Sequence, residues 1–94
     1  MLSSLTKGGA ETLRERPQRI KEVNREIEAM GGKVLQQFAV LGPYDFVNIV
    51  EAPDNDTVAR VSVELSARGS VRILTLAAIP IDAFIARLQA KASR

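Results

Sequence analysis

Apolar residues recur at helical spacing in the first third of the chain. They form a single stripe when placed on a helix, and the stripe consists of Leu13, Ile20, Val23, Ile27 and Met30. Pro17 suits the first turn of this helix, with residues 10–16 as a separate lead-in turn or a kinked extension. Gly31 and Gly32 are expected to end the helix, because glycine takes positive φ without a steric cost.

Short runs of β-branched and aromatic residues, bounded by turn residues, predict four strands. The predicted strands are residues 2–5, 33–41, 45–52 and 71–78. Gly42 and Pro43 separate the second strand from the third, so that these two are expected to pair antiparallel. This assignment leaves the regions after residues 52 and 78 for further helices.

Two more helices are predicted in the second half of the chain. Asp54 or Asn55 is expected to cap the first of them, because a side-chain oxygen can accept from an otherwise unpaired backbone N–H. Gly69 ends it, and its buried stripe is Val58, Val61 and Leu65. Asp82 is expected to cap the last helix, and the apolar residues of that helix are Phe84, Ile85 and Leu88.

The resulting β-α-β-β-α-β order predicts an α+β, ferredoxin-like fold with a four-stranded antiparallel sheet and an additional C-terminal helix. In that fold both internal helices cover one face of the sheet. Alternation along the third strand, however, places Val47 and Ile49 on one face and Phe46 and Val50 on the other. Strands that are apolar on both faces are typical of sheets covered on both faces. We therefore expect a second copy to cover the free face, giving a symmetric homodimer.

Composition restricts the function more than it defines it. The 94 residues, 46% of them hydrophobic, predict a single domain spanning residues 1–94. Thirteen basic and eleven acidic residues alternate along the chain, which indicates an ordinary solvated surface. Phe38 and Phe46 are the aromatic residues of the central strands, and without a basic rim they do not indicate RNA binding. No export signal or membrane span is recognisable, so we expect a cytoplasmic protein without nucleic-acid or membrane partners.

The chain contains no histidine and no cysteine. This excludes thiol nucleophiles, disulfides, zinc sites of the usual Cys/His type and histidine acid–base catalysis. No spacing of carboxylates resembles a calcium loop. We therefore expect no metal site and no cofactor.

Five short motifs together resemble the small bacterial GYD-domain family. In order, they lie at residues 6–9, 31–33, 42–47 (GPYDFV), 51–54 (EAPD) and 69–72 (GSVR). The family is assigned to the dimeric α/β-barrel superfamily. The resemblance implies a ferredoxin-like chain that pairs as a homodimer, or assembles as a higher multiple of dimers. It implies no particular activity, because the family is largely without one.

The candidate ligand-binding residues are Tyr44, Asp45, Asn48 and Arg72. A phenol and a carboxylate at the mouth of an apolar cavity between sheets can orient a small organic ligand. Arg72 can bind a carboxylate of such a ligand through two parallel hydrogen bonds. The alternative is structural: Asp45 accepts backbone hydrogen bonds in the hairpin turn, Tyr44 covers the core edge and Arg72 pairs with Asp45. The structural alternative is favoured, because acids in turns usually serve the turn.

Two classes of function remain open from the sequence. The favoured class is a small non-catalytic ligand-binding or regulatory module, a homo-oligomer with a cavity between sheets and helix faces that meet a larger partner. The second is a cofactor-independent enzyme of the oxygenase or isomerase type, in which Tyr44 or Asp45 moves a proton. The charged face with Glu22 and Glu26 can be read as a partner surface, but a solvated helix face is the favoured interpretation.

Overall fold

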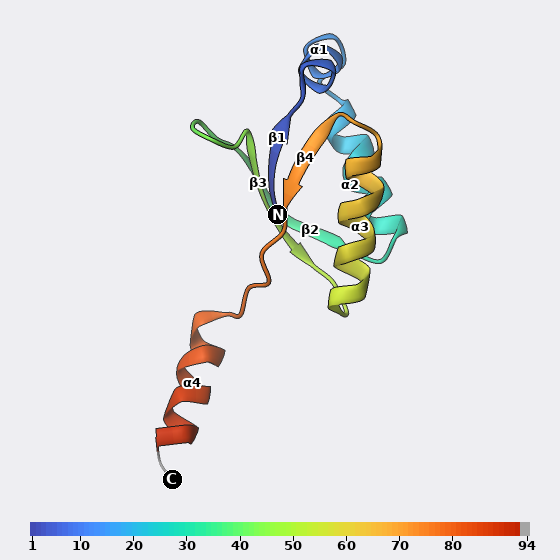
Figure 1. Ribbon diagram of the computed structural model, residues 1–94. Coiled ribbons are helices and arrows are strands. Elements are labelled where there is room, and N and C mark those ends of the chain that lie inside the picture. The colour runs from blue at the N-terminus through green and yellow to red at the C-terminus, as the bar shows by residue number, and fades with distance from the viewer. Residues whose placement is uncertain (93–94) are drawn as a thin grey trace.

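The computed structural model describes residues 1–92, which form four strands and four helices (Figure 1). Their order is β1 (Leu2–Leu5), α1 (Lys7–Glu15), α2 (Arg19–Ala29), β2 (Lys33–Ala39), β3 (Phe46–Glu51), α3 (Asn55–Ala67), β4 (Val71–Leu74) and α4 (Ile81–Ala92). This arrangement confirms the predicted α+β class.

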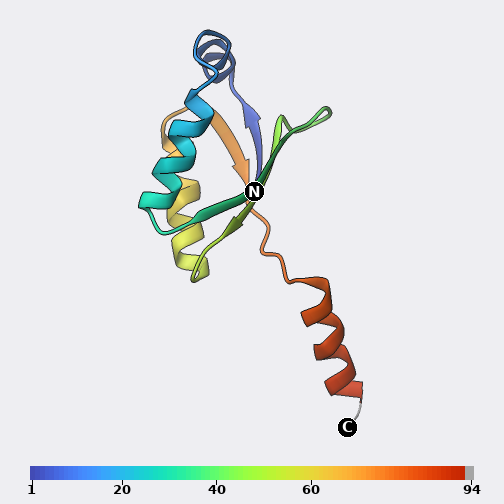
Figure 2. The ribbon, with the colours of Figure 1, turned by 180° about the vertical axis from the view of Figure 1, so that it is seen from behind.

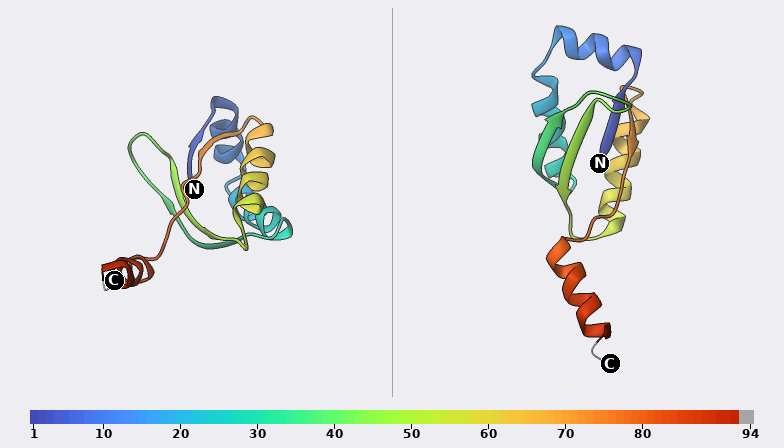
Figure 3. Two further views of the ribbon diagram at one scale, coloured as in Figure 1. Left: turned by 60° about the horizontal axis from the view of Figure 1, so that its bottom comes forward. Right: turned by 90° about the vertical axis from the view of Figure 1, so that its left-hand side faces the viewer.

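The four strands form one antiparallel sheet in the order β2-β3-β1-β4. This is the ferredoxin-like order, in which each β-α-β crossover places its second strand two positions away from its first. Helices α2 and α3 both lie on one face of the sheet (Figure 2). The other face, which we call the open face, carries no helix and is seen directly in the right-hand view of Figure 3.

The core lies between α2, α3 and the covered face of the sheet. Its fully buried residues come from the two helices, namely Ile27, Val61 and Leu65. Half-buried residues around them include Val34, Val50, Val71 and Ile73 from the strands. The predicted alternation is confirmed, because Val50 packs on this core whereas Ile49 is exposed. A core of this size leaves apolar surface of the sheet available for other contacts.

The start of α1 is fastened to the turn between α3 and β4. Thr6 caps the helix, because its Oγ1 accepts from the Gly9 N–H at 3.1 Å. The same hydroxyl donates to the Gly69 oxygen at 2.7 Å, and the Thr6 N–H donates to the Ser70 oxygen at 3.0 Å. Gly9 is buried here, and a Cβ on it would overlap the Ser70 carbonyl oxygen. Only glycine therefore fits this position.

The first helical stripe is divided between two helices. Residues 7–15 form a separate helix, and Pro17 lies in the turn before α2, so that its predicted place in the first turn of α2 is wrong. The Arg19 N–H donates to the Arg16 oxygen at 3.0 Å across this turn. Proline disfavours helical backbone in the residue before it, which explains why the helix breaks at this point.

The predicted ends of the last two elements also need correction. β4 ends at Leu74 and not at residue 78, because Leu74 pairs with Leu2, the first residue of its only neighbouring strand. α4 starts at Ile81, which places Asp82 inside its first turn and not at the cap. The Phe84 N–H donates to the Pro80 oxygen at 3.0 Å. A carbonyl before the helix accepts that first bond, as at any helix start.

Helix α4 projects from the rest of the molecule. Residues 75–80 carry the chain beyond the end of the sheet, and α4 lies on the side opposite α2 and α3 (Figures 1 and 3). Residues 81–90 are all exposed. The longest dimension is accordingly 57 Å, against 29 Å and 19 Å for the other two.

Candidate functional site

Asp45 lies at the base of the β2–β3 hairpin, and its carboxylate is part of the fold. Its Oδ2 accepts a hydrogen bond from the Leu5 N–H at 2.8 Å. Its backbone N–H donates to the Ser3 oxygen and its carbonyl accepts from the Val40 N–H, each at 2.9 Å. The bonds to Leu5 and Ser3 join the end of β1 to the hairpin, and the bond from Val40 closes the hairpin itself. Tyr44 precedes Asp45 in the loop and is half-buried.

Asp45 and Arg72 lie at the same end of the open face. Ser4 pairs with Arg72 on β4, and the β1–β3 register that pairs Ser3 with Phe46 places Asp45 on the other side of Ser4. The Ser4 hydroxyl donates to the Pro43 oxygen at 3.2 Å. Within residues 1–92 no ion pair joins Asp45 to Arg72, so the expected pairing of these two is not observed. Two candidate residues are thus brought together across a strand, close to Tyr44.

Asn48 lies on the opposite face of the sheet, toward the helices. Its backbone exchanges two hydrogen bonds with Met1, each 2.8 Å long. Its side-chain Oδ1 is buried and has no hydrogen-bond partner within the described residues. Asn48 is therefore separated from Asp45 and Arg72 by the thickness of the sheet.

A cavity of about 130 Å³ lies between the sheet and helices α1 and α2. Its wall is mainly apolar, and Asn48 is among the few polar residues that line it. A second polar group in the wall is the amide pair of Asn24 and Gln37, which exchange hydrogen bonds of 2.9 and 3.1 Å between α2 and β2. The paired amides use part of their hydrogen-bonding capacity on each other, whereas the buried Asn48 oxygen has no partner within the described residues and can accept from a small occupant.

The open face carries an exposed apolar surface. Cross-strand pairing places five apolar side chains on it, namely Leu2, Phe38, Val47, Ile49 and Leu74. Phe38, Ile49 and Leu74 are 52%, 47% and 44% exposed. Contiguous apolar patches on a small protein commonly mark interaction surfaces.

A chain of ion pairs runs along α2 and reaches α3. Arg16 and Arg19 pair with Glu22 at 2.7 and 3.2 Å, and Arg19 also pairs with Glu26 at 3.0 Å. Glu26 contacts Arg68 at the end of α3 as well. Burial raises the pKa of Glu26, but the hydrogen bonds from Arg68 and Arg19 outweigh burial and hold it below its usual value. These charges join two helices and are not a set of free groups.

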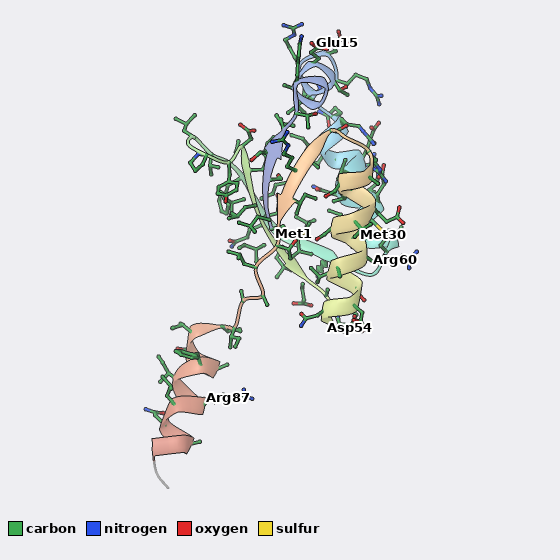
Figure 4. The ribbon with its side chains drawn as sticks, in the orientation of Figure 1. Met1, Glu15, Met30, Asp54, Arg60 and Arg87 are labelled. Atoms are coloured by element: carbon green, nitrogen blue, oxygen red, sulfur yellow. The ribbon has the colours of Figure 1, made fainter. Side chains whose placement is uncertain are left out.

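The described residues offer no metal centre. Within residues 1–92 no group of three or more acidic side chains lies close enough to hold an ion, and the sequence has no histidine or cysteine. No helix in this part of the chain has the length and apolar character needed to cross a membrane. The side chains of Arg60 on α3 and Arg87 on α4 are both exposed and point away from their helices (Figure 4).

Two exposed apolar features of the structure are not among the candidate site residues predicted from the sequence. One is the apolar stripe of α4, and the other is Leu41 at the tip of the β2–β3 hairpin, which is fully exposed. The stripe is visible in the spacing of Phe84, Ile85 and Leu88, but spacing alone does not tell whether the same chain covers it. The exposure of Leu41 could not be recognised from the sequence, because the pattern predicts it to be the last residue of a strand.

Similarity to known proteins identifies the family of the chain. A protein of Thermus thermophilus described as glutamine synthetase and cystathionine beta-lyase binding protein is 59% identical over 90 residues, which are 95% of each chain. No solved structure matches the sequence. The family model of the GYD domain matches residues 1–88. The chain therefore belongs to the GYD-domain family.

Proposed function

We propose that this chain is a non-catalytic binding protein whose partners are enzymes of the two kinds named for its relative, a glutamine synthetase and a cystathionine beta-lyase. The observation that carries the proposal is the 59% identity across 95% of both chains. The match covers 95% of the relative's own length, so nearly all of that binding protein corresponds to the domain that this chain shares with it. The surface must then lie on the GYD domain itself.

Catalysis gains no support from the arrangement of the candidate residues. A cofactor-independent enzyme would use Tyr44 or Asp45 to move a proton, but the Asp45 carboxylate already accepts from the Leu5 N–H. Asn48 and Arg72 lie on opposite faces of the sheet and do not converge on one substrate atom. A general base needs hydrogen-bond reach to the proton that it removes.

The proposal includes a homodimer in which the open faces of two copies pack together. The exposed apolar residues Phe38, Ile49 and Leu74 support it. Burial of apolar surface contributes roughly 25 cal/mol per Å², and a face-to-face pair of four-stranded sheets has the extent of an ordinary stable interface. Multiples of dimers would form in the same way, through burial of surface where the helix faces of separate dimers meet.

A small organic anion is the ligand that fits this arrangement. We place its site at the end of the open face, where Arg72 supplies the charge and Tyr44 and Asp45 form the edge. Arg72 is exposed, and within residues 1–92 no carboxylate pairs with it. Asn48 is assigned to the helix-side cavity and not to this site, because it lines that cavity.

Direct binding to the two enzymes tests the proposal. The enzymes of the source organism are immobilised separately, and the full chain is passed over each at micromolar concentrations by surface plasmon resonance. We expect saturable binding to at least one enzyme and none to an unrelated protein of similar charge. Flat responses on both enzymes would overturn the proposal. The proposal also places the chain in the cytoplasm, and fractionation of the source cells tests this location.

A further inference from the structure

Helix α4 carries an apolar stripe that the described chain leaves uncovered. Ile81, Phe84, Ile85 and Leu88 follow the spacing i, i+3, i+4 and i+7, which places them on one side of the helix. They are 67%, 44%, 44% and 52% exposed. A 12-residue helix is only marginally stable alone in water, and most helices gain their stability from packing an apolar face. The stripe therefore needs a surface to pack against.

The segment before α4 directs this helix away from the sheet and from α2 and α3 of the same chain. Thr75 is fastened to α3 by a 2.7 Å hydrogen bond between its Oγ1 and the Ser62 Oγ. Beyond it the chain passes the end of the sheet, and within residues 1–92 no strand or helix packs extensively on α4. The helix is displaced to the side that the open face looks toward (Figure 3). A second copy packed on the open face would occupy that side.

The β2–β3 hairpin offers a matching apolar group at the other end of the sheet. Its loop extends toward the same side as α4, but from the opposite end (Figures 1 and 3). Leu41 stands at its tip beside Gly42, which has a φ of 119°. The leucine side chain is 101% exposed. An isolated loop gains nothing by presenting a leucine to water, since its burial is worth about 2 kcal/mol.

Two-fold symmetry connects these two features. When two open faces meet around a two-fold axis perpendicular to the strands, the axis exchanges the two ends of the sheet. The hairpin of one copy then lies where α4 of the other copy begins, and the contact forms twice. Within the hairpin loop, residues 40–45, Leu41 is the large hydrophobic residue that is exposed.

We propose that α4 is an exchanged arm: its apolar stripe packs against the β2–β3 hairpin of a second copy, with Leu41 seated among Phe84, Ile85 and Leu88. The inference rests on the homodimer included in the proposed function and names the elements that close it. The arm covers the stripe and the hairpin tip in the same contact.

Cysteine cross-linking tests this contact, because the natural chain has no cysteine to interfere. Full-length Leu41→Cys and Ile85→Cys chains are refolded together and oxidised. A disulfide requires Cα atoms within about 7 Å, so we expect a linked dimer in the mixture and little in either variant alone. Val63→Cys mixed with Ile85→Cys is the matched control, because Val63 is 67% exposed on α3, away from the open face.

The outcomes separate the arm from the dimer. If native mass spectrometry shows a dimer but the mixture stays unlinked, the arm inference is overturned and the homodimer stands. A monomer at all concentrations overturns both. A single chain carrying both cysteines reports the remaining arrangement: linkage without doubling of mass means that α4 folds back on its own hairpin, which also overturns the arm.

Charge substitution gives a second readout that needs no oxidation. Leu88→Glu places a carboxylate in the proposed contact, and we expect the dimer dissociation constant to rise about tenfold or more. Ala86→Glu is the control, because Ala86 lies on the opposite side of α4 from the stripe. Equal dissociation constants for the two variants in sedimentation equilibrium would overturn the arm. Circular dichroism of both variants confirms that the helix content is retained.

Discussion

At the scale of single residues, the neighbours Gly8 and Gly9 differ in whether a side chain fits at their position. A Cβ on Gly9 would overlap the Ser70 carbonyl oxygen, whereas a Cβ on Gly8 meets nothing within 4 Å. We expect Gly9→Ala to lower the free energy of unfolding by about 1–3 kcal/mol, because backbone must move. Gly8→Ala is the control and should raise it by about 0.5–1 kcal/mol through helix propensity. Urea unfolding of both variants checks the pair, and equal effects would contradict the close approach.

The role of Asp45 can be separated from that of Tyr44. Asp45→Ala leaves the half-buried Leu5 N–H without its acceptor, so we expect a loss of about 1–3 kcal/mol in the free energy of unfolding. Tyr44→Phe is the matched variant, because it removes one polar atom in the adjacent position and should change stability by less than about 1 kcal/mol. Thermal unfolding measures both. A stable Asp45→Ala chain would show that the carboxylate is not needed by the hairpin.

Roles that depend on residues close in the sequence, such as helix caps, could be predicted, whereas roles that depend on contacts between strands could not. Asp54 caps α3 as expected: its Oδ1 accepts from the Thr57 N–H at 2.8 Å. Gly31 and Gly69 end their helices with φ of 102° and 75°. The separation of Asn48 from Arg72 depends on which face of the sheet the helices cover, and the sequence left both faces apolar. Grouping these two in one site therefore could not be tested by pattern alone.

At the scale of elements, the types and order of the helices and strands could be predicted, but the residues at which several of them end could not. The strand at 71–78 has uniform β propensity, yet it ends at Leu74 because its neighbour β1 pairs no further than Leu2. Its length is thus set by another segment of the chain. Residues 7–15 similarly form a helix because Thr6 caps them and Gly9 packs on Ser70. The buried residue of this helix is Gly9, and a glycine gives no sign of burial in a hydrophobic pattern.

The contact between α2 and α3 should respond to acid. The pKa of Glu26 is held below its usual value of 4.5 in the folded chain, burial opposing the shift and hydrogen bonds from Arg68 and Arg19 causing it. Because the folded pKa is the lower one, the stabilisation is complete above pH 4.5 and is lost as the pH falls through the folded value.

The variant Glu26→Gln isolates this effect. We expect it to be less stable than the natural chain at pH 7 by no more than about 1 kcal/mol, since the pair is partly exposed. The difference should shrink toward pH 3. Guanidinium chloride unfolding at both pH values measures it, and Asp54, whose pKa is also lowered, stays intact in both chains. A difference that grows on acidification would contradict the assigned direction.

At the scale of the whole molecule, the apolar character of both sheet faces was the informative signal. It predicted that the helices alone do not cover the strands, and the exposed Phe38, Ile49 and Leu74 agree with this. The sequence could not predict where α4 would lie, because six residues separate it from the sheet and no pattern fixes their direction. The place where a partner binds depends on how the folded chain and its copies are arranged, and the sequence pattern does not contain that arrangement.

The open face should be the surface on which assembly depends. Ile49→Lys places a charge at its centre, where pairing of two sheets would bury it without a partner, and such a charge costs several kcal/mol. We expect this variant to remain folded, because Ile49 is 47% exposed, and to be a monomer in native mass spectrometry at concentrations where the natural chain is a dimer. Val63→Lys is the control on α3, also exposed, and should keep the natural mass. If Ile49→Lys leaves the assembly unchanged while Val63→Lys disrupts it, the copies meet through their helices, and the open face is then available to the enzyme partner instead.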